Sequence, residues 1–289
     1  MDVLSDAIAA MRTGRPHASL TRRDSPCRMR FLGQGGVGFH SVVEGSARLV
    51  PADGGIAPVA LGPGDVVFIT HRGAYELVGE RDGEPPAAAM ICGAYFLDES
   101  RPHPLLTELP DFVHLAAGDV DGGPLRAVLG LLRAELDEPQ PGSDSIVTSY
   151  LDTLLLLILR TWWLRVRGGT GDLTGWAAAL ADPAVAAALR AVHSDPAHPW
   201  TVGELGALSS LSRAPFARRF TASVGMPPLG YLTWWRMTLA AGWLRDPDEA
   251  PLRSVAERAG YASEFAFAKA FKREFGLAPG RYRKLRAAG

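Results

Sequence analysis

Large apolar side chains recur every fourth residue near the end of the chain, at Phe267, Phe271 and Phe275. This spacing places the three rings on one face of a helix, while charged residues occupy the other faces. Ser263 precedes the run and is a residue type that caps helix N-termini. Gly276 follows it and favours a helix end. The pattern predicts a short basic helix held to a core by aromatic rings.

The same pattern occurs 51 residues earlier in the chain. The matching pairs are Ser212 and Ser263, Phe216 and Phe267, Phe220 and Phe271, Gly225 and Gly276, Pro228 and Pro279, and Tyr231 and Tyr282. Such an internal repeat indicates two copies of one supersecondary unit. A shorter helical segment precedes each copy, VGELGALSSLS and VAERAGYAS respectively. Helix, tight turn and capped helix together predict a helix-turn-helix motif, whose second helix enters the major groove of DNA.

The first third of the chain has a different periodicity. After a short amphipathic helix predicted over residues 2–12, residues 18–97 contain apolar segments separated by Gly, Pro and Asp. The segments are MRFLG, GFHSVVEGSARLV, VALGPGDVVFIT, AYELVG and AAMICGAYFL. Several short strands at such spacing predict a β-sandwich or β-barrel.

Helical periodicity returns in the middle of the chain. Residues 124–138 predict an amphipathic helix, and residues 143–167 predict a longer one that is apolar nearly all round. A helix of that kind is expected to be buried. Its most apolar run, Leu154 to Leu159, lies between Asp152 and Arg160 and is too short to span a membrane. Five residues, GGTGD, then have the composition of a flexible linker.

Composition sharpens this division of the chain. A length of 289 residues with 47% hydrophobic side chains favours two ordinary folded domains. Residues 183–289 hold 15 basic and 8 acidic side chains, a net charge of +7, whereas the remainder carries −8. One basic and one acidic domain is typical of a nucleic-acid binder with a separate module. Two cysteines imply no disulfide framework, and the N-terminus lacks a signal-peptide core.

Two regions of the chain each resemble a known family. LSRAPFARRFTASVGMPPLGYLTWWRMTLAAGWL and VAERAGYASEFAFAKAFKREFGLAPGRYR closely resemble the AraC/XylS-type DNA-binding domain, two helix-turn-helix units joined by a long helix. The succession FH-x4-G-x-A-x-L and L-x-P-G-D-V-x-F resembles the cupin barrel common at the N-terminus of such regulators. The resemblance implies an α+β chain with a barrel over 1–115, a dimerising helical hairpin over 116–167, a linker over 168–182 and a DNA-binding domain over 183–289.

Outward positions of the two repeated helices are the candidates for DNA contacts. By family position, Ala214, Ala217 and Arg218 face bases in the first unit, and Arg218 suits guanine O6 and N7. A solvated or phosphate-bound arginine is the alternative for Arg218. The full candidate set is Arg213, Ala214, Ala217 and Arg218 in the first unit, Glu264, Phe265, Ala268, Lys269 and Lys272 in the second, and Arg283 and Lys284 as phosphate contacts near the end.

Individual residues of the second helix suggest different chemistry. Glu264 can accept a hydrogen bond from cytosine N4, and Phe265 can contact a thymine methyl group. Lys269 could contact guanine, or it could contact only phosphate. An aromatic side chain in a helix is more often part of a core, which is the alternative for Phe265. A rigid connecting helix over 229–244 would set the two reading helices about one DNA turn, ~34 Å, apart, with Trp234 and Trp235 in its core.

Cupin barrels often hold a metal, so the residues at those positions matter. His40 and Glu44 are present, but no His-x-His pair accompanies them, and Tyr75 stands where the resemblance would place a ligand histidine. We therefore expect no metal, no cofactor and no catalysis. A metal-dependent cupin isomerase or dioxygenase fused to a DNA-binding domain is the alternative.

The two cysteines allow a redox hypothesis. An early Cys27 and a strand Cys92 resemble the arrangement in family members that respond to reactive chlorine or other oxidants. Thiolate oxidation would be the mechanism, and the arginines around Cys27 could lower its pKa. Two buried, inert cysteines are the alternative. A DNA-repair methyltransferase is disfavoured because neither cysteine stands in the Pro-Cys-His-Arg setting of that chemistry.

These observations together predict a cytoplasmic, sequence-specific transcription regulator. Its partners would be operator DNA, a second copy of the chain and RNA polymerase, with no membrane. A small molecule or an oxidant sensed by the barrel would control it. The sequence leaves open the operator, the effector and the direction of regulation.

Overall fold

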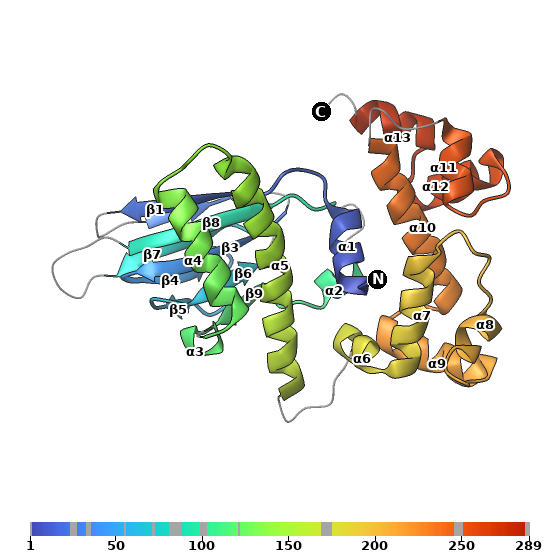
Figure 1. The fold of residues 1–289 in the computed structure, drawn as a ribbon, viewed down its shortest axis with the longest axis horizontal. Helices are drawn as coiled ribbons and strands as arrows, with labels where there is room; N and C mark the ends of the chain where they lie inside the picture. Colours follow the sequence, from blue (N-terminus) through green and yellow to red (C-terminus); the bar gives the residue numbers. More distant parts are fainter. Residues whose placement is uncertain are drawn as a thin grey trace. The chain divides into compact units, whose positions relative to one another are not determined.

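The chain forms two compact units in the computed structural model (Figure 1). Unit 1 comprises Met1–Arg12, Ser100–Glu108 and Asp172–Gly289, and unit 2 comprises Thr13–Glu99 and Leu109–Gly171. The structure describes residues 2–23, 28–32, 36–54, 56–70, 73–80, 88–98, 103–120, 122–168, 175–245 and 251–286.

Unit 2 is built on two antiparallel sheets. One has the strand order β1-β8-β3-β6-β9, formed by β1 (His17–Arg23), β8 (Ala88–Tyr95), β3 (Val37–Glu44), β6 (Val66–Ile69) and β9 (Phe112–Leu115). The other has the order β2-β7-β4-β5, formed by β2 (Arg28–Phe31), β7 (Tyr75–Glu80), β4 (Ser46–Pro51) and β5 (Val59–Leu61). Together they confirm the predicted cupin-like barrel, and each predicted apolar segment contains at least one strand.

Side chains from both sheets meet in the barrel core. Val42, Val67 and Met90 come from the larger sheet, and Leu49 and Leu77 come from the smaller one. Each of these side chains is at most 1% exposed. The alternation of strand residues explains this, because every second side chain points to the same face of a sheet.

Two helices pack together and against strands of the larger sheet. They are α4 (Pro124–Asp137) and α5 (Ser143–Gly168), which contact each other and β1, while α5 also contacts β9; the short α3 (Ala117–Val120) precedes them. The expectation that the longer helix is buried all round was wrong. Leu164 is 61% exposed and Ile146 is 37% exposed. The face of α5 that packs on α4 and the sheet is covered, whereas the side that carries Leu164 and Ile146 is exposed.

The length and composition of α5 also satisfy a membrane-span criterion. Among the described residues, Ser143–Val166 is the one helix long and apolar enough to cross a membrane. Of the 18-residue stretch that meets this criterion, 33% is buried. Core helices of soluble proteins meet the same criterion. The packing of α5 on α4, β1 and β9 gives its apolar face a role within unit 2.

Unit 1 is helical and contains two helix-turn-helix motifs. Its elements are α1 (Val3–Met11), α2 (Pro104–Thr107), α6 (Gly175–Ala181), α7 (Pro183–Ser194), α8 (Val202–Ala207), α9 (Arg213–Val224), α10 (Pro228–Arg245), α11 (Leu252–Arg258), α12 (Glu264–Phe275) and α13 (Pro279–Arg286). The motifs are α8 with α9 and α11 with α12, and α10 joins them (Figure 1).

Local signals fix the ends of these helices, as predicted at Ser263, Gly225 and Gly276. The Ser263 side chain accepts a hydrogen bond from the Ala266 amide, and Thr201 with Glu204 forms a capping box at α8. Gly225 and Gly276 end α9 and α12 with φ of 79° and 71°, a left-handed conformation that glycine adopts without a steric penalty. Ser212 differs from Ser263, since its side chain makes no cap hydrogen bond.

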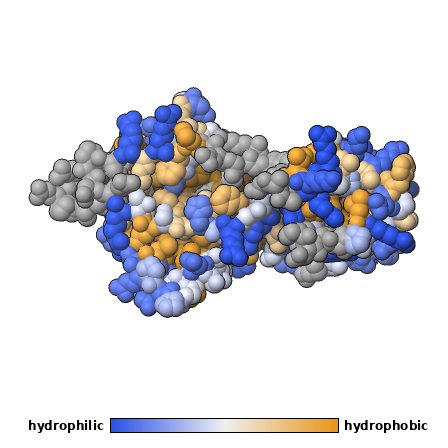
Figure 2. Space-filling view, turned by 90° about the horizontal axis from the view of Figure 1, so that it is seen from above, coloured by the Kyte–Doolittle hydropathy of each residue, from blue (hydrophilic) through white to orange (hydrophobic). Residues whose placement is uncertain are grey.

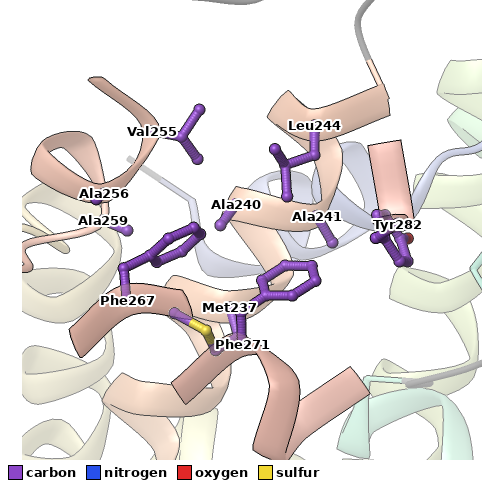
Figure 3. Close-up of a cluster of buried hydrophobic side chains, with 10 residues drawn as sticks. All are labelled: Met237, Ala240, Ala241, Leu244, Val255, Ala256, Ala259, Phe267, Phe271 and Tyr282. Atoms are coloured by element: carbon purple, nitrogen blue, oxygen red, sulfur yellow. The ribbon is translucent and has the colours of Figure 1, made fainter. Parts of the chain in front are cut away.

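The aromatic stripe of α12 packs into a core shared with α10, α11 and α13. Figure 3 shows Phe267 and Phe271 beside Met237 of α10 and Val255 of α11, with Tyr282 of α13 close to Phe271. The ring centroids of Phe271 and Tyr282 are 5.3 Å apart in an edge arrangement. Both phenylalanines are fully buried, as their spacing predicts.

Unit 1 also includes segments from the predicted barrel and linker ranges. Helix α1 contacts α7 and α10, and α6 contacts α7 and α9. The structure thus differs from the predicted boundaries, because Ile8, Met11 and Trp176 bury their side chains in unit 1 to between 1% and 3% exposure. The hydrophobic effect assigns these segments to unit 1, although their sequence positions lie before Pro183.

Candidate nucleic-acid interface and barrel pocket

Helix α9 presents one polar face to solvent. Phe216 and Phe220 are 0% exposed and hold the helix to the core. Arg213, Ala214 and Arg218 are exposed, and Ala217 is half-buried. Three of the four candidate residues of the first unit are therefore exposed on the helix that the phenylalanine pair holds to the core.

Helix α12 repeats this arrangement with different side chains. Phe265 is 82% exposed, although Phe267 is fully buried only two residues later. Glu264, Lys269 and Lys272 are exposed too, and Ala268 is half-buried. The exposure expected for Phe265 is confirmed, and the alternative that it belongs to the core is wrong. A large apolar ring near the start of α12 is thus exposed on a surface that also carries charged side chains.

The candidate residues differ from neighbouring charged residues in whether they form ion pairs. Arg219 pairs with Asp182, and Arg273 pairs with Glu274. Six candidate side chains form no ion pair with any of the described residues: Arg213, Arg218, Glu264, Lys269, Lys272 and Lys284. Five of the six are basic and exposed, so the protein itself does not neutralise them. Positive charges of this kind are suited to a polyanion.

The last helix supplies further basic residues. Lys284 of α13 is exposed, whereas Arg283 is half-buried. Helix α13 is anchored by Tyr282, which is 5% exposed and packs on Phe271 of α12. This anchoring holds Lys284 in a fixed relation to α12.

Helix α10, which joins the two motifs, is buried along much of its length. Trp235 is 2% exposed and stacks on His193, with ring centroids 4.0 Å apart. Trp234 is 8% exposed. Both rings are core residues, as predicted, so they are not available for stacking on bases.

In the barrel, two residues at the cupin metal positions bond to each other. His40 Nε2 lies 2.8 Å from the Tyr75 hydroxyl, and Glu44 instead pairs with Arg133. Burial lowers the pKa of His40 to about 3, so its ring is neutral at pH 7. Among the described residues no three His, Cys, Asp or Glu side chains come together as metal ligands.

A cavity of about 590 Å³ opens beside this pair. Register places its lining on one face of the larger sheet, where Ser19 of β1 lies beside Cys92 of β8, which lies beside His40 of β3. Phe31 and Tyr75 of the smaller sheet line it as well, with their rings stacked at 4.9 Å. A volume of this size, an aromatic wall and a few polar groups are typical of a small-molecule site.

The two cysteines stand differently in the structure. Cys27 lies outside the described residues, so its setting is not part of the structure described. Cys92 lines the cavity as a free thiol. Burial raises the pKa of the Cys92 thiol to about 12, and a hydrogen bond with Thr21 offsets this only in part. At pH 7 the thiol is protonated, and protonated thiols react slowly with oxidants.

We expect Cys92 to react about a thousandfold more slowly than an ordinary cysteine with a disulfide reagent such as DTNB at pH 8, because three pKa units remove most of the thiolate. The measurement uses the Cys27→Ala variant, so that Cys92 is the remaining thiol. The rate should rise about tenfold per pH unit up to pH 10 without a plateau. The same variant unfolded in urea is the control, and a native rate within tenfold of the unfolded rate would contradict the expectation.

A β-barrel with a cavity and two helix-turn-helix motifs in one chain are features of a DNA-binding transcription regulator. A Cupin family model matches residues 2–163, and a helix-turn-helix domain model matches residues 205–285. The chain is 34% identical to an AraC-like transcription regulator of Streptomyces antibioticus over 98% of this chain and 99% of that one. The chain belongs to this family, the AraC-like transcription regulators with an N-terminal cupin domain.

Two further similarities complete the comparison. The RCS-specific HTH-type transcriptional activator RclR of Escherichia coli is 33% identical over 85% of this chain and 84% of that protein. The solved DNA-binding domain of AdpA, in complex with a target DNA, is 31% identical over 37% of this chain and 95% of that chain, with a TM-score of 0.34. Sequence similarity to regulators thus extends over nearly the whole length of the chain.

Sequence reasoning missed two groups of residues. His17 and Ser19 line the cavity from β1, whose HASLTRR sequence alternates too weakly to be recognised as a strand on its own. Arg236 of α10 gave no signal either, because one arginine in a helix is usually a surface charge. In the structure Arg236 is half-buried between Trp235 and Met237, which are both buried.

Proposed function

We propose that this chain regulates transcription by reading DNA with α9 and α12 and that a small molecule in the barrel cavity controls this activity. The observation that carries the first part is the 82% exposure of Phe265 on a helix whose Phe267 and Phe271 are fully buried. Exposing such a ring to water has no benefit for folding, whereas a thymine methyl group in the major groove would cover it.

The remaining DNA contacts divide by chemistry. Arg218 donates to guanine, Glu264 accepts from cytosine, and Lys269 reaches guanine or phosphate. Arg213, Lys272 and Lys284 contact phosphates, and Arg283 supports them from its half-buried position. Ala214, Ala217 and Ala268 allow the helices to approach the bases closely. The exposed basic side chains Arg213, Arg218, Lys269, Lys272 and Lys284, which form no ion pair with any described residue, support the proposal.

The effector is a largely apolar small molecule with at least one hydrogen-bonding group. Phe31, Tyr75 and Ile69 provide apolar surface in the cavity, and Ser19 and His40 provide neutral polar atoms. The Nδ1 atom of His40 is buried and has no hydrogen-bond partner among the described residues. A ligand atom that bonds to Nδ1 would remove the free-energy cost of that unpaired group.

Filling the cavity tests this proposal. Ala94 lines the cavity beside Gly38 and His17, and Ala60 is exposed on β5. Compounds from a library of apolar and aromatic molecules that bind the cavity should raise the melting temperature of the unmodified protein and change its affinity for DNA. We expect Ala94→Phe to abolish both effects. Ala60→Phe is the matched control and should respond like the unmodified protein. An unaltered response in Ala94→Phe would place the effector elsewhere.

An oxidant is the second candidate effector. It is favoured by the similarity to RclR, whose name describes an activator specific for reactive chlorine species. The high pKa of Cys92 speaks against that residue as the first thiol to be oxidised. Hypochlorite treatment with and without Cys27→Ala and Cys92→Ala separates the candidates, since equal effects on DNA binding in all variants would exclude thiol sensing.

The uncovered face of α5 supports a homodimer. Leu164 and Ile146 of α5 are exposed, and so is Leu131 of α4. Figure 2 shows hydrophobic residues gathered on the face of unit 2 in view, with hydrophilic residues around them. A second copy would cover apolar surface of this kind. A sedimentation mass of one chain at micromolar concentration would contradict the proposal.

The chain acts without catalysis and without a bound metal, because the cupin ligand positions hold a His40–Tyr75 hydrogen bond instead of a ligand set. Metal analysis of the purified protein tests this, and a stoichiometric metal would favour the cupin enzyme instead. As a regulator it works in the cytoplasm, where it meets its operator and RNA polymerase. Co-purification of the polymerase on operator DNA tests that contact.

A further inference from the structure

Arg236, near the middle of α10, holds the loop that precedes the first helix-turn-helix motif. Its Nε donates to the Pro196 carbonyl at 2.6 Å. Its Nη2 donates to the carbonyls of Ala197 at 3.2 Å and His198 at 2.9 Å. One guanidinium group therefore binds three successive carbonyl groups between α7 and α8.

This loop is braced by its own hydrogen bonds. The His198 amide donates to the Asp195 carboxylate at 3.0 Å, and Trp200 Nε1 donates to the Asp195 carbonyl at 2.9 Å. The capping box at Thr201 starts α8 directly afterwards. A side chain that fixes this loop thereby fixes α8 and, through the α8–α9 packing, the reading helix α9.

The Arg236 guanidinium and the Ala197 carbonyl group also lie close to the turn of the second motif. Gly260 lies between α11 and α12 with φ of +76°. A Cβ atom there would lie 2.6 Å from the Ala197 carbonyl oxygen and 2.8 Å from Arg236 Nη2. Only glycine permits so close an approach. The next residue, Tyr261, places its ring centroid 5.9 Å from Arg236 Cζ.

The chemistry of the contact suits arginine alone. Arg236 is half-buried, and burial lowers its pKa, while Tyr261 and Asp195 oppose this in part. A desolvated guanidinium needs several acceptors, and its planar fork can bind neighbouring carbonyls at once. A lysine side chain would carry the same charge, but it lacks the planar guanidinium group that binds neighbouring carbonyl groups at once.

We propose that Arg236 is the positioning residue that sets the distance and angle between α9 and α12, so that the protein accepts an operator only when its two half-elements have one spacing. Figure 1 shows α10 running from the α8–α9 pair to α11, α12 and α13. Two reading helices on one rigid body act as a bivalent ligand, whose second contact benefits from a high effective concentration. The inference rests on the proposed reading of DNA by both helices.

The test compares three duplexes. The first is selected from a random pool by the unmodified protein, the second carries two additional base pairs between its halves, and the third has one half scrambled. The unmodified protein should prefer the first over the third by about a hundredfold. Arg236→Met should bind the first about tenfold more weakly, bind the third unchanged within twofold, and lose most of the penalty for the insertion. Arg190→Met, at an exposed arginine of α7, is the matched control.

The outcomes distinguish this inference from the function on which it rests. Equal weakening of Arg236→Met on all three duplexes would overturn it, because that result indicates a phosphate contact or damaged folding. Unmodified protein that binds the first and third duplexes alike would instead overturn the reading by two helices. Arg236→Met that behaves like the unmodified protein on all three would overturn the positioning role alone.

A distance measurement covers the case in which Arg236→Met is too unstable to assay. Spin labels at Ala222→Cys and Lys272→Cys, in the Cys27→Ala and Cys92→Ala background, report on α9 and α12. The distribution of label distances should be narrow with Arg236 and should broaden in Arg236→Lys, which keeps the charge. An equal width in both proteins would refute the positioning role.

Discussion

Replacing Phe271 by alanine is expected to lower the free energy of unfolding of unit 1 by about 3–5 kcal/mol. The ring is fully buried between α10, α11 and α13, where it contacts Phe275 at a centroid distance of 4.4 Å and Tyr282 at 5.3 Å. Its removal leaves a cavity in the core that orients α12 and α13. Urea unfolding followed by tryptophan fluorescence measures the loss.

Phe265→Ala is the matched control on the same helix, because that ring is 82% exposed. Its free energy of unfolding should stay within about 0.5 kcal/mol of the unmodified protein. Its affinity for a selected duplex should fall nonetheless, if the ring covers a thymine methyl group. A large loss of stability in Phe265→Ala would show that this ring has a structural role after all.

Arg218→Ala is expected to weaken binding to a selected duplex by about 1–3 kcal/mol and to relax the sequence preference at one base pair. The exposed guanidinium on α9 has no ion-pair partner among the described residues, so its hydrogen bonds remain available for guanine O6 and N7. Titration against the selected duplex and against duplexes changed at single positions measures both effects.

Two variants identify the kind of contact that Arg218 makes. Arg219→Ala, which removes an arginine paired with Asp182, should leave the sequence preference unchanged. Lys284→Ala should weaken binding on every sequence and lower the salt slope of log K by about one unit. If Arg218→Ala weakens binding to random DNA as strongly as binding to the selected duplex, Arg218 contacts phosphate.

Much of unit 1 could be predicted because the signals are local. The four-residue spacing of Phe267, Phe271 and Phe275 decides which face of α12 is covered, and Ser263 and Gly276 decide where it starts and ends. Residue type and spacing alone determine such features. The same reasoning located the exposed positions of α9 and α12, including Phe265.

Predictions failed where burial depends on distant neighbours. Helix α5 is apolar nearly all round, yet Leu164 is 61% exposed, since only contacts with α4, β1 and β9 determine which face is covered. Strand β1 becomes a strand through pairing along β8, from His17 opposite Ala94 to Arg23 opposite Ala88. Its own residues carry too little alternation to reveal that partner.

The sequence by itself determined the two repeated motifs, the exposed positions of their second helices, the barrel and the charge difference between residues 183–289 and the rest of the chain. These follow from periodicity and composition, which are properties of neighbouring residues. Only the tertiary structure decided that α1 and α6 pack in unit 1, that Cys92 is a half-buried thiol beside a cavity, and that Arg236 holds the loop before the first motif close to the turn of the second. Those features arise between residues far apart in the chain, where packing and desolvation rather than local propensity set the free energy.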